Sequence, residues 1–142
     1  MHQRQPHRTG PLQRPALLVL TRGSRSDIFW VETRGGCMRP FLSSRSRLVP
    51  LLKTAVCRAG DVALCGEPDR AVLHRLYRRQ GNGWWAADDA ARTPFQWVPD
   101  GALRGRLLGH TPQGTPGLLW GYAARILFSA ARRFKRLFNV SS

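Results

Sequence analysis

The sequence predicts a small, mainly β domain followed by one amphipathic α-helix. Short apolar, β-branched and aromatic runs recur along the middle of the chain, and turn residues separate them. A helical period of apolar residues begins only near the C-terminus. A chain of 142 residues has room for one such domain with a modest core.

The chain starts with a polar stretch that has no hydrophobic period. Residues 1–15 are rich in Gln, Arg, Pro and His, which predicts a disordered basic tail. Contact with an anionic surface and simple solubilisation are both compatible with such a tail. The β domain is expected to follow at residues 16–109.

Strands are expected wherever an apolar or aromatic run lies between turn residues. The first two form a hairpin, and Pro50 in the third suggests an edge strand because proline cannot donate to a sheet ladder. Turns at Gly60-Asp61, Gly66 to Asp69 and Gly81 to Gly83 separate the later ones. The expected strands are residues 16–21, 28–33, 48–52, 62–65, 71–77, 84–87 and 101–108.

Residues 110–117 contain Gly, Pro and Thr and are expected to link the β domain to a helix at 118–138. Apolar residues recur there at helical spacing, while Arg125, Arg132 and Arg136 share another face. The helix is too charged to span a bilayer but suits an anionic membrane surface. An equally open interpretation is that its apolar stripe packs on the domain or on a partner. The stripe consists of Leu119, Tyr122, Ala123, Ile126, Leu127, Ala130, Phe134, Leu137 and Phe138.

The net charge of +15 is concentrated at the two ends of the chain. Residues 1–53 hold ten basic and two acidic side chains, residues 54–103 hold six of each, and the remainder holds seven basic and no acidic ones. This distribution argues against a uniformly basic body that binds nucleic acid.

The three cysteines include no C-x-x-C pair and no closely spaced histidine, so neither a disulfide framework nor a zinc site is indicated. We expect no metal and no cofactor. The apolar run from Ala16 to Leu20 is too short for a signal peptide or a membrane span, which favours the cytoplasm, with peripheral attachment to a membrane as an option.

Five segments carry a more specific pattern. They are GCMRPFL (36–42), AGDVALC (59–65), LHRLY (73–77), AADD (86–89) and LRGRLLG (103–109). Their order and spacing resemble the successive boxes of the type I signal peptidase and self-cleaving repressor peptidase superfamily, over roughly residues 26–109. The resemblance implies a small signal-peptidase-like β-fold.

The resemblance also implies the site. The family's first box is G-x-S-M-x-P, and here Cys37 stands where the family has its nucleophilic serine. The His-Arg box is similar to that of the archaeal and endoplasmic-reticulum enzymes, which implies that His74 is the base. The acidic box lacks its glycine, so Asp88 is the closest match to the third member and Asp89 the next. Residues expected near the substrate or the oxyanion are Gly36, Met38, Pro40 and Arg75.

A cysteine and a histidine form a coherent catalytic pair. A thiol with a pKa near 8.5 is already partly ionised at neutral pH, and a nearby imidazole activates it further. A carboxylate that accepts the other imidazole N–H would fix the tautomer. The plainer interpretation is that Cys37 is a small buried residue and His74 a structural one.

The function expected from the resemblance is a signal-peptidase-like endopeptidase that cleaves a leader or signal segment of another protein. Its substrate would be an extended peptide, and cleavage in trans is favoured because no helix-turn-helix pattern precedes Cys37. Two alternatives stay open: an inactive or repurposed peptide-binding relative of the same fold, and a basic nucleic-acid-binding module. Cys57 and Cys65 are expected to be packing residues.

Overall fold

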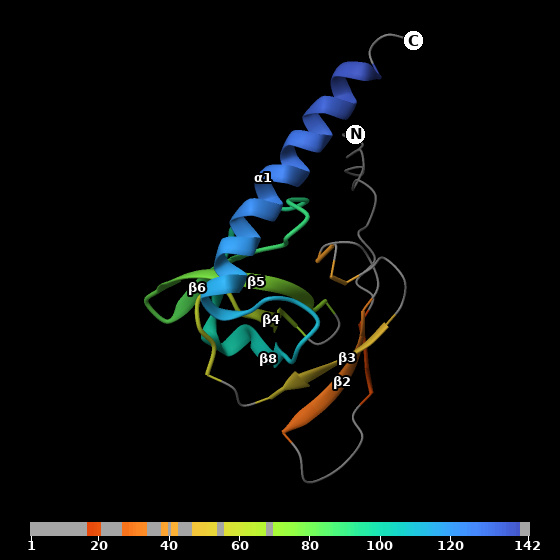
Figure 1. Ribbon diagram of the computed structural model, residues 1–142. Coiled ribbons are helices and arrows are strands. Elements are labelled where there is room, and N and C mark those ends of the chain that lie inside the picture. Colours follow the sequence, from red (N-terminus) through yellow and green to blue (C-terminus); the bar gives the residue numbers. More distant parts are fainter. Residues whose placement is uncertain are drawn as a thin grey trace, which may run out of the picture.

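The computed structural model describes residues 17–20, 27–33, 38–39, 41–42, 47–53, 56–67 and 70–139. Over these ranges the chain is mainly β with one C-terminal helix (Figure 1), which confirms the predicted class. The tail expected at 1–15 lies outside the described residues. The elements are β1 (Leu17–Leu20), β2 (Ile28–Thr33), β3 (Arg47–Leu52), β4 (Val62–Cys65), β5 (Val72–Gln80), β6 (Gly83–Ala87), β7 (Gln96–Pro99), the 3-10 turn η1 (Asp100–Ala102), β8 (Leu103–Leu107) and α1 (Gly114–Phe138).

The strands form one antiparallel sheet in the order β1-β2-β3-β8-β4-β5-β6-β7. Strand β8 is therefore inserted between β3 and β4, next to the box at 59–65. The sheet is strongly curved, because β7 and the end of β4 line one pocket although two strands separate them in the sheet.

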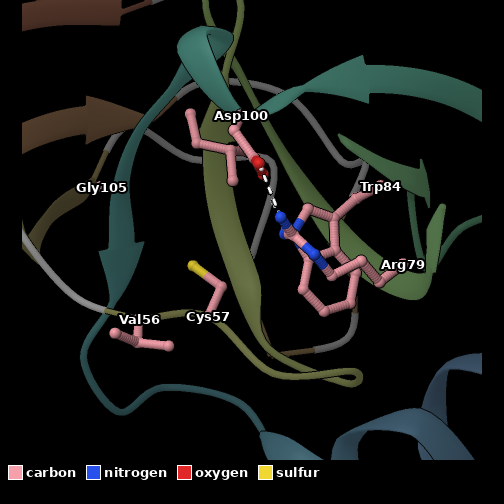
Figure 2. Close-up of a pocket in the computed structure, with 7 residues that line it drawn as sticks. Val56, Cys57, Arg79, Trp84, Asp100 and Gly105 are labelled. Carbon is pink, nitrogen blue, oxygen red and sulfur yellow. Dashed lines mark hydrogen bonds and ion pairs between the residues drawn. The ribbon is translucent and has the colours of Figure 1, made fainter. Parts of the chain in front are cut away.

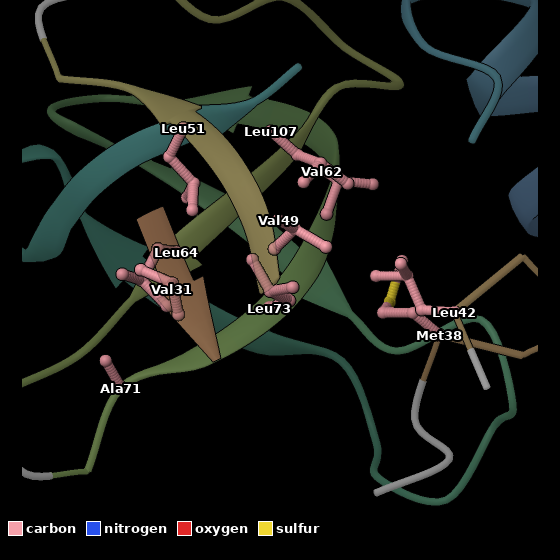
Figure 3. Packing of buried hydrophobic residues seen from close by; sticks show 10 residues of the cluster. All are labelled: Val31, Met38, Leu42, Val49, Leu51, Val62, Leu64, Ala71, Leu73 and Leu107. Atoms are coloured by element: carbon pink, nitrogen blue, oxygen red, sulfur yellow. The ribbon is translucent and has the colours of Figure 1, made fainter. Parts of the chain in front are cut away.

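Both faces of the sheet are covered, as strand β4 demonstrates. Val62 and Leu64 belong to a first hydrophobic cluster and Ala63 and Cys65 to a second. Successive side chains of a strand point to opposite faces, so the continuous apolar run of β4 serves two cores at once. Figure 3 shows the first cluster, in which residues of β2, β3, β4, β5 and β8 meet.

Strand β3 is not an edge strand, so the expectation based on Pro50 is wrong. It pairs with β2 along its whole length and with β8 through Leu51 and Leu52. The Pro50 carbonyl accepts a hydrogen bond from the Leu108 N–H (3.0 Å) and therefore faces β8, and so does its nitrogen. The pairing of β3 with β8 starts only at Leu51, so the missing N–H of Pro50 leaves no ladder hydrogen bond unmade.

Strand β7 was not predicted from the sequence. It is a short edge strand that pairs only with β6, and Val98 is its one buried residue. A four-residue segment with one inward side chain and a terminal proline gives almost no periodic signal.

Helix α1 begins at Gly114, inside the stretch 110–117 that was expected to be a linker. Glycine and proline there lower the local helix propensity, although proline is tolerated in a first helical turn. The start is stabilised by a distant residue, since the Gly114 N–H donates to the Asp61 carboxylate (2.9 Å). A carboxylate at a helix N-terminus is favourable because it satisfies an unpaired N–H and complements the helix dipole.

The backbone of the helix approaches the domain at small residues, and most of its apolar stripe stays exposed. Its buried residues are Gly117, Gly121 and Ala124, whereas the large apolar side chains of the stripe are exposed. Of the stripe, Tyr122 does pack on the domain, with its ring centroid 4.9 Å from that of Tyr77 on β5, whereas the other large side chains are 63–73% exposed. Within the part of the chain that the structure describes, no helix is both long and apolar enough to cross a bilayer.

Candidate functional site

Three of the five sequence boxes meet in one buried polar network, which is centred on Arg75. This side chain is fully buried and forms a bidentate ion pair with Asp89, through Nε to Oδ1 (2.8 Å) and Nη2 to Oδ2 (2.7 Å). Nη1 donates to the carbonyls of Gly60 (2.7 Å) and Pro112 (2.5 Å), and Nη2 also donates to Thr111 Oγ1 (2.7 Å). A guanidinium has five N–H groups, and all five are used.

Arg75 therefore has a different position from the one expected. The resemblance implied a contact with the substrate or the oxyanion, but every donor of Arg75 is engaged inside the protein. Its side chain instead ties β5 to the end of β6, to the box at 59–65 and to the segment that leads into α1. A buried arginine with complete bidentate and backbone bonding organises the elements around it.

Gly60 and Asp61 contact the first residue of helix α1 and hold its N-terminus in place. Gly60 has a φ of +93°, and a Cβ there would lie 1.7 Å from the Gly114 carbonyl oxygen, so only glycine fits. The buried Asp61 carboxylate accepts from the N–H groups of Arg58 (2.8 Å) and Gly114 (2.9 Å). This box thus positions the start of α1 against β5.

His74 is a buried imidazole, 4% exposed, on β5 opposite Ala63. Its Nδ1 is buried and has no hydrogen-bond partner among the described residues. The ring lines a pocket of about 270 Å³ together with Cys65, Trp97 and Val98. Burial lowers the pKa of His74 below its ordinary 6.5, and the negative charge of Asp88 opposes this effect. The ring is therefore neutral at pH 7 and has a nitrogen available to accept a proton.

Asp88 is fully buried but does not form the expected hydrogen bond to the His74 ring. In the described structure its carboxylate accepts from the Arg92 N–H (2.8 Å), from the N–H (3.1 Å) and Oγ1 (3.0 Å) of Thr93, and from Arg125 Nη1 (3.2 Å). It acts on His74 through its charge, as the pKa of His74 indicates. Asp89, the second choice for this role, is the partner of Arg75.

The nucleophile box is described only in part. Gly36, Cys37 and Pro40 lie outside the described residues. Met38 is buried and packs with Leu42 in the first hydrophobic cluster (Figure 3). His74, in contrast, lines a pocket together with members of the second cluster.

A second pocket, of about 250 Å³, contains none of the residues of this network (Figure 2). Arg79 pairs there with Asp100 (2.7 Å) and lies over the Trp84 ring, 5.5 Å from its centroid. Burial and the charge of Asp61 raise the pKa of the Cys57 thiol, so the thiol that lines this pocket is protonated at neutral pH. Among the described residues, no group of three His, Cys, Asp or Glu side chains is arranged to hold a metal ion.

Two arginines of α1 were not expected at this site. Arg125 donates to the Asp88 carbonyl (2.8 Å) and to the Thr93 carbonyl (3.0 Å), and Arg132 donates to the Ala91 carbonyl (2.6 Å). Both were assigned only to the polar face of the helix. The available signal was their position on the same side of the helix as Gly121, because glycines on one helical face indicate close packing.

The chain was compared with protein-family models, with curated proteins and with solved structures, and none of the three comparisons gives a match.

Proposed function

We propose that the chain is a signal-peptidase-like endopeptidase in which Cys37 is the nucleophile and His74 the base. One observation supports this most strongly. The boxes at 59–65, 73–77 and 86–89, which are far apart in the sequence, meet in a single buried network, and the strand position next to Arg75 carries a buried, neutral imidazole with an unpartnered nitrogen that senses the charge of Asp88. The substrate class is an extended peptide segment of another protein, such as a leader.

The proposed reaction needs no group other than these side chains and water. His74 takes the thiol proton of Cys37 as the sulfur attacks the carbonyl carbon of the scissile peptide bond. The charge of Asp88 favours the imidazolium that forms, which then gives its proton to the departing amine. Water, deprotonated by His74, hydrolyses the thioester and returns the thiol.

A peptide library derived from a proteome tests this proposal without knowledge of the substrate. Wild-type protein is expected to generate new peptide termini, which mass spectrometry identifies, and Cys37→Ala is expected to generate none. Cys57→Ala is the matched control and should retain cleavage, because its thiol has a raised pKa and lies in the other pocket. Equal cleavage by Cys37→Ala and the wild type would refute the assignment.

A second candidate function is a peptide-binding relative that does not cleave. The observation that favours it is that Arg75 and Asp88 are both committed to bonds within the fold, and that Met38 and His74 lie with different hydrophobic clusters. In that case the pocket at His74 would hold a peptide side chain without any chemistry.

Alkylation by iodoacetamide at pH 7 discriminates between the two candidates. If Cys37 is activated by His74, it should react at least about tenfold faster than Cys57 and Cys65, and His74→Gln should abolish the difference. Cys65 is the internal reference, because burial raises its pKa to about 12 and so suppresses the thiolate. Equal rates at Cys37 and Cys57 would favour the binding protein. Peptide mapping by mass spectrometry measures all three rates in one sample.

A further inference from the structure

Helix α1 has two faces of different character. The face with Gly117, Gly121 and Ala124 is buried against the domain. The large apolar residues on the other side are 63–73% exposed, although side chains of this kind are usually buried. They are Leu119, Ile126, Leu127, Phe134, Leu137 and Phe138.

The glycine face fixes the orientation of the helix. A Cβ at Gly121 would lie 2.5 Å from Tyr77 Oη and 2.6 Å from Arg75 Cδ, so the helix backbone rests directly on β5. Arg125 and Arg132 fasten the same side to the loop after β6. Apart from Tyr122, whose ring contacts Tyr77, the large apolar side chains of the stripe consequently point away from the β domain, and the second half of α1 extends beyond it (Figure 1).

The charge of the helix identifies what can cover the stripe. Helix α1 carries five basic residues and no acidic one. Two of the five hold the loop after β6, which leaves Arg133, Lys135 and Arg136 exposed near the end of the helix, around Phe134 and Leu137. An apolar stripe flanked by exposed basic side chains complements a surface that is apolar inside and negatively charged at its rim.

We propose that α1 is an interfacial anchor that lies in the surface of a bilayer containing anionic lipids. The exposed stripe enters the boundary of headgroups and acyl chains, the three basic residues contact lipid phosphates, and the β domain stays on the water side. A second copy of the chain is disfavoured as the occupant because two such helices would bring like charges together. This anchoring does not depend on Cys37 and is independent of the proposed peptidase activity.

Binding of the full chain to lipid vesicles tests the proposal. Vesicles of equal parts phosphatidylglycerol and phosphatidylcholine should bind the wild type at least about tenfold more tightly than vesicles of phosphatidylcholine alone. Phe134→Glu should weaken binding to the anionic vesicles by about tenfold or more, since it puts a charge into the stripe. Co-sedimentation measures both effects, and Cys37→Ala should bind like the wild type.

Val56→Glu is the matched control, because Val56 is 86% exposed, lies outside the helix and changes the net charge equally. It should bind within about twofold of the wild type. If Phe134→Glu binds like Val56→Glu, charge alone drives the association and the anchor is refuted. Equal binding to both kinds of vesicle refutes the charge complementarity. A dimer that persists with vesicles and dissociates with Phe134→Glu would assign the stripe to a second copy of the chain.

Discussion

Two arginines of the same strand, β5, illustrate how the surroundings of a residue decide its role. Arg75 is buried and satisfied on every N–H, while Arg79 forms an ion pair with Asp100 whose side chains are 51% and 42% exposed. When a buried ion pair loses one partner, the other is left as an uncompensated charge in an apolar medium. When an exposed ion pair loses one partner, water solvates the other.

The conservative substitution to lysine separates the two cases. Arg75→Lys keeps the charge but has three donors in place of five, so it should destabilise the fold by about 3 kcal/mol. Arg79→Lys should leave the urea midpoint unchanged. Equilibrium unfolding in urea measures both variants, and a similar midpoint for the two would contradict the structural importance of Arg75.

At the scale of elements, the position of α1 depends on glycine. In a helix that packs on nothing, Gly→Ala stabilises by about 1 kcal/mol because alanine has the better helix propensity. At Gly121 the added Cβ would meet Tyr77 and Arg75, and the sign of the effect should reverse. The close approach of α1 to β5, which sets the direction of the apolar stripe, requires that residue 121 has no side chain.

Gly121→Ala should therefore destabilise the protein by about 1–3 kcal/mol through overpacking. Gly101→Ala is the matched control, since a Cβ at Gly101 meets nothing within 4 Å. Thermal unfolding followed by far-UV circular dichroism measures both. A stabilised Gly121→Ala protein would mean that the helix does not rest on β5.

At the scale of the whole molecule, one sheet separates two hydrophobic clusters. Strands β4 and β5 contribute side chains to both clusters. Disruption of one cluster therefore removes packing from strands that the other cluster needs. The β domain should consequently unfold as one cooperative unit, as small single domains usually do.

Substitutions in the two clusters test this cooperativity. Leu64→Ala in the first cluster and Leu76→Ala in the second should each destabilise the same single transition by about 2–5 kcal/mol. Val56→Ala, at an exposed position, should have no effect. Tryptophan fluorescence and circular dichroism should give coincident curves, and separate transitions for the two leucine variants would show that the clusters fold independently.

Features that depend on a local pattern could be predicted from the sequence. The β class and the strands around Val62–Cys65 and Ile28–Thr33 follow from short apolar runs between turns, and the amphipathic helix follows from its period of 3.6. Segments with little periodic signal, such as Gln96–Pro99, could not be recognised in this way. The boxes also indicated which residues belong together, although not what each one does.

The tertiary structure alone decided the partners of the polar groups. The start of α1 depends on a carboxylate contributed by Asp61, and Arg75 is engaged by the carbonyls and carboxylate that converge on it. The direction of the apolar stripe likewise follows from glycines that seat the helix on β5. These outcomes arise from contacts between segments distant in the chain, and a local period in the sequence carries no information about such contacts.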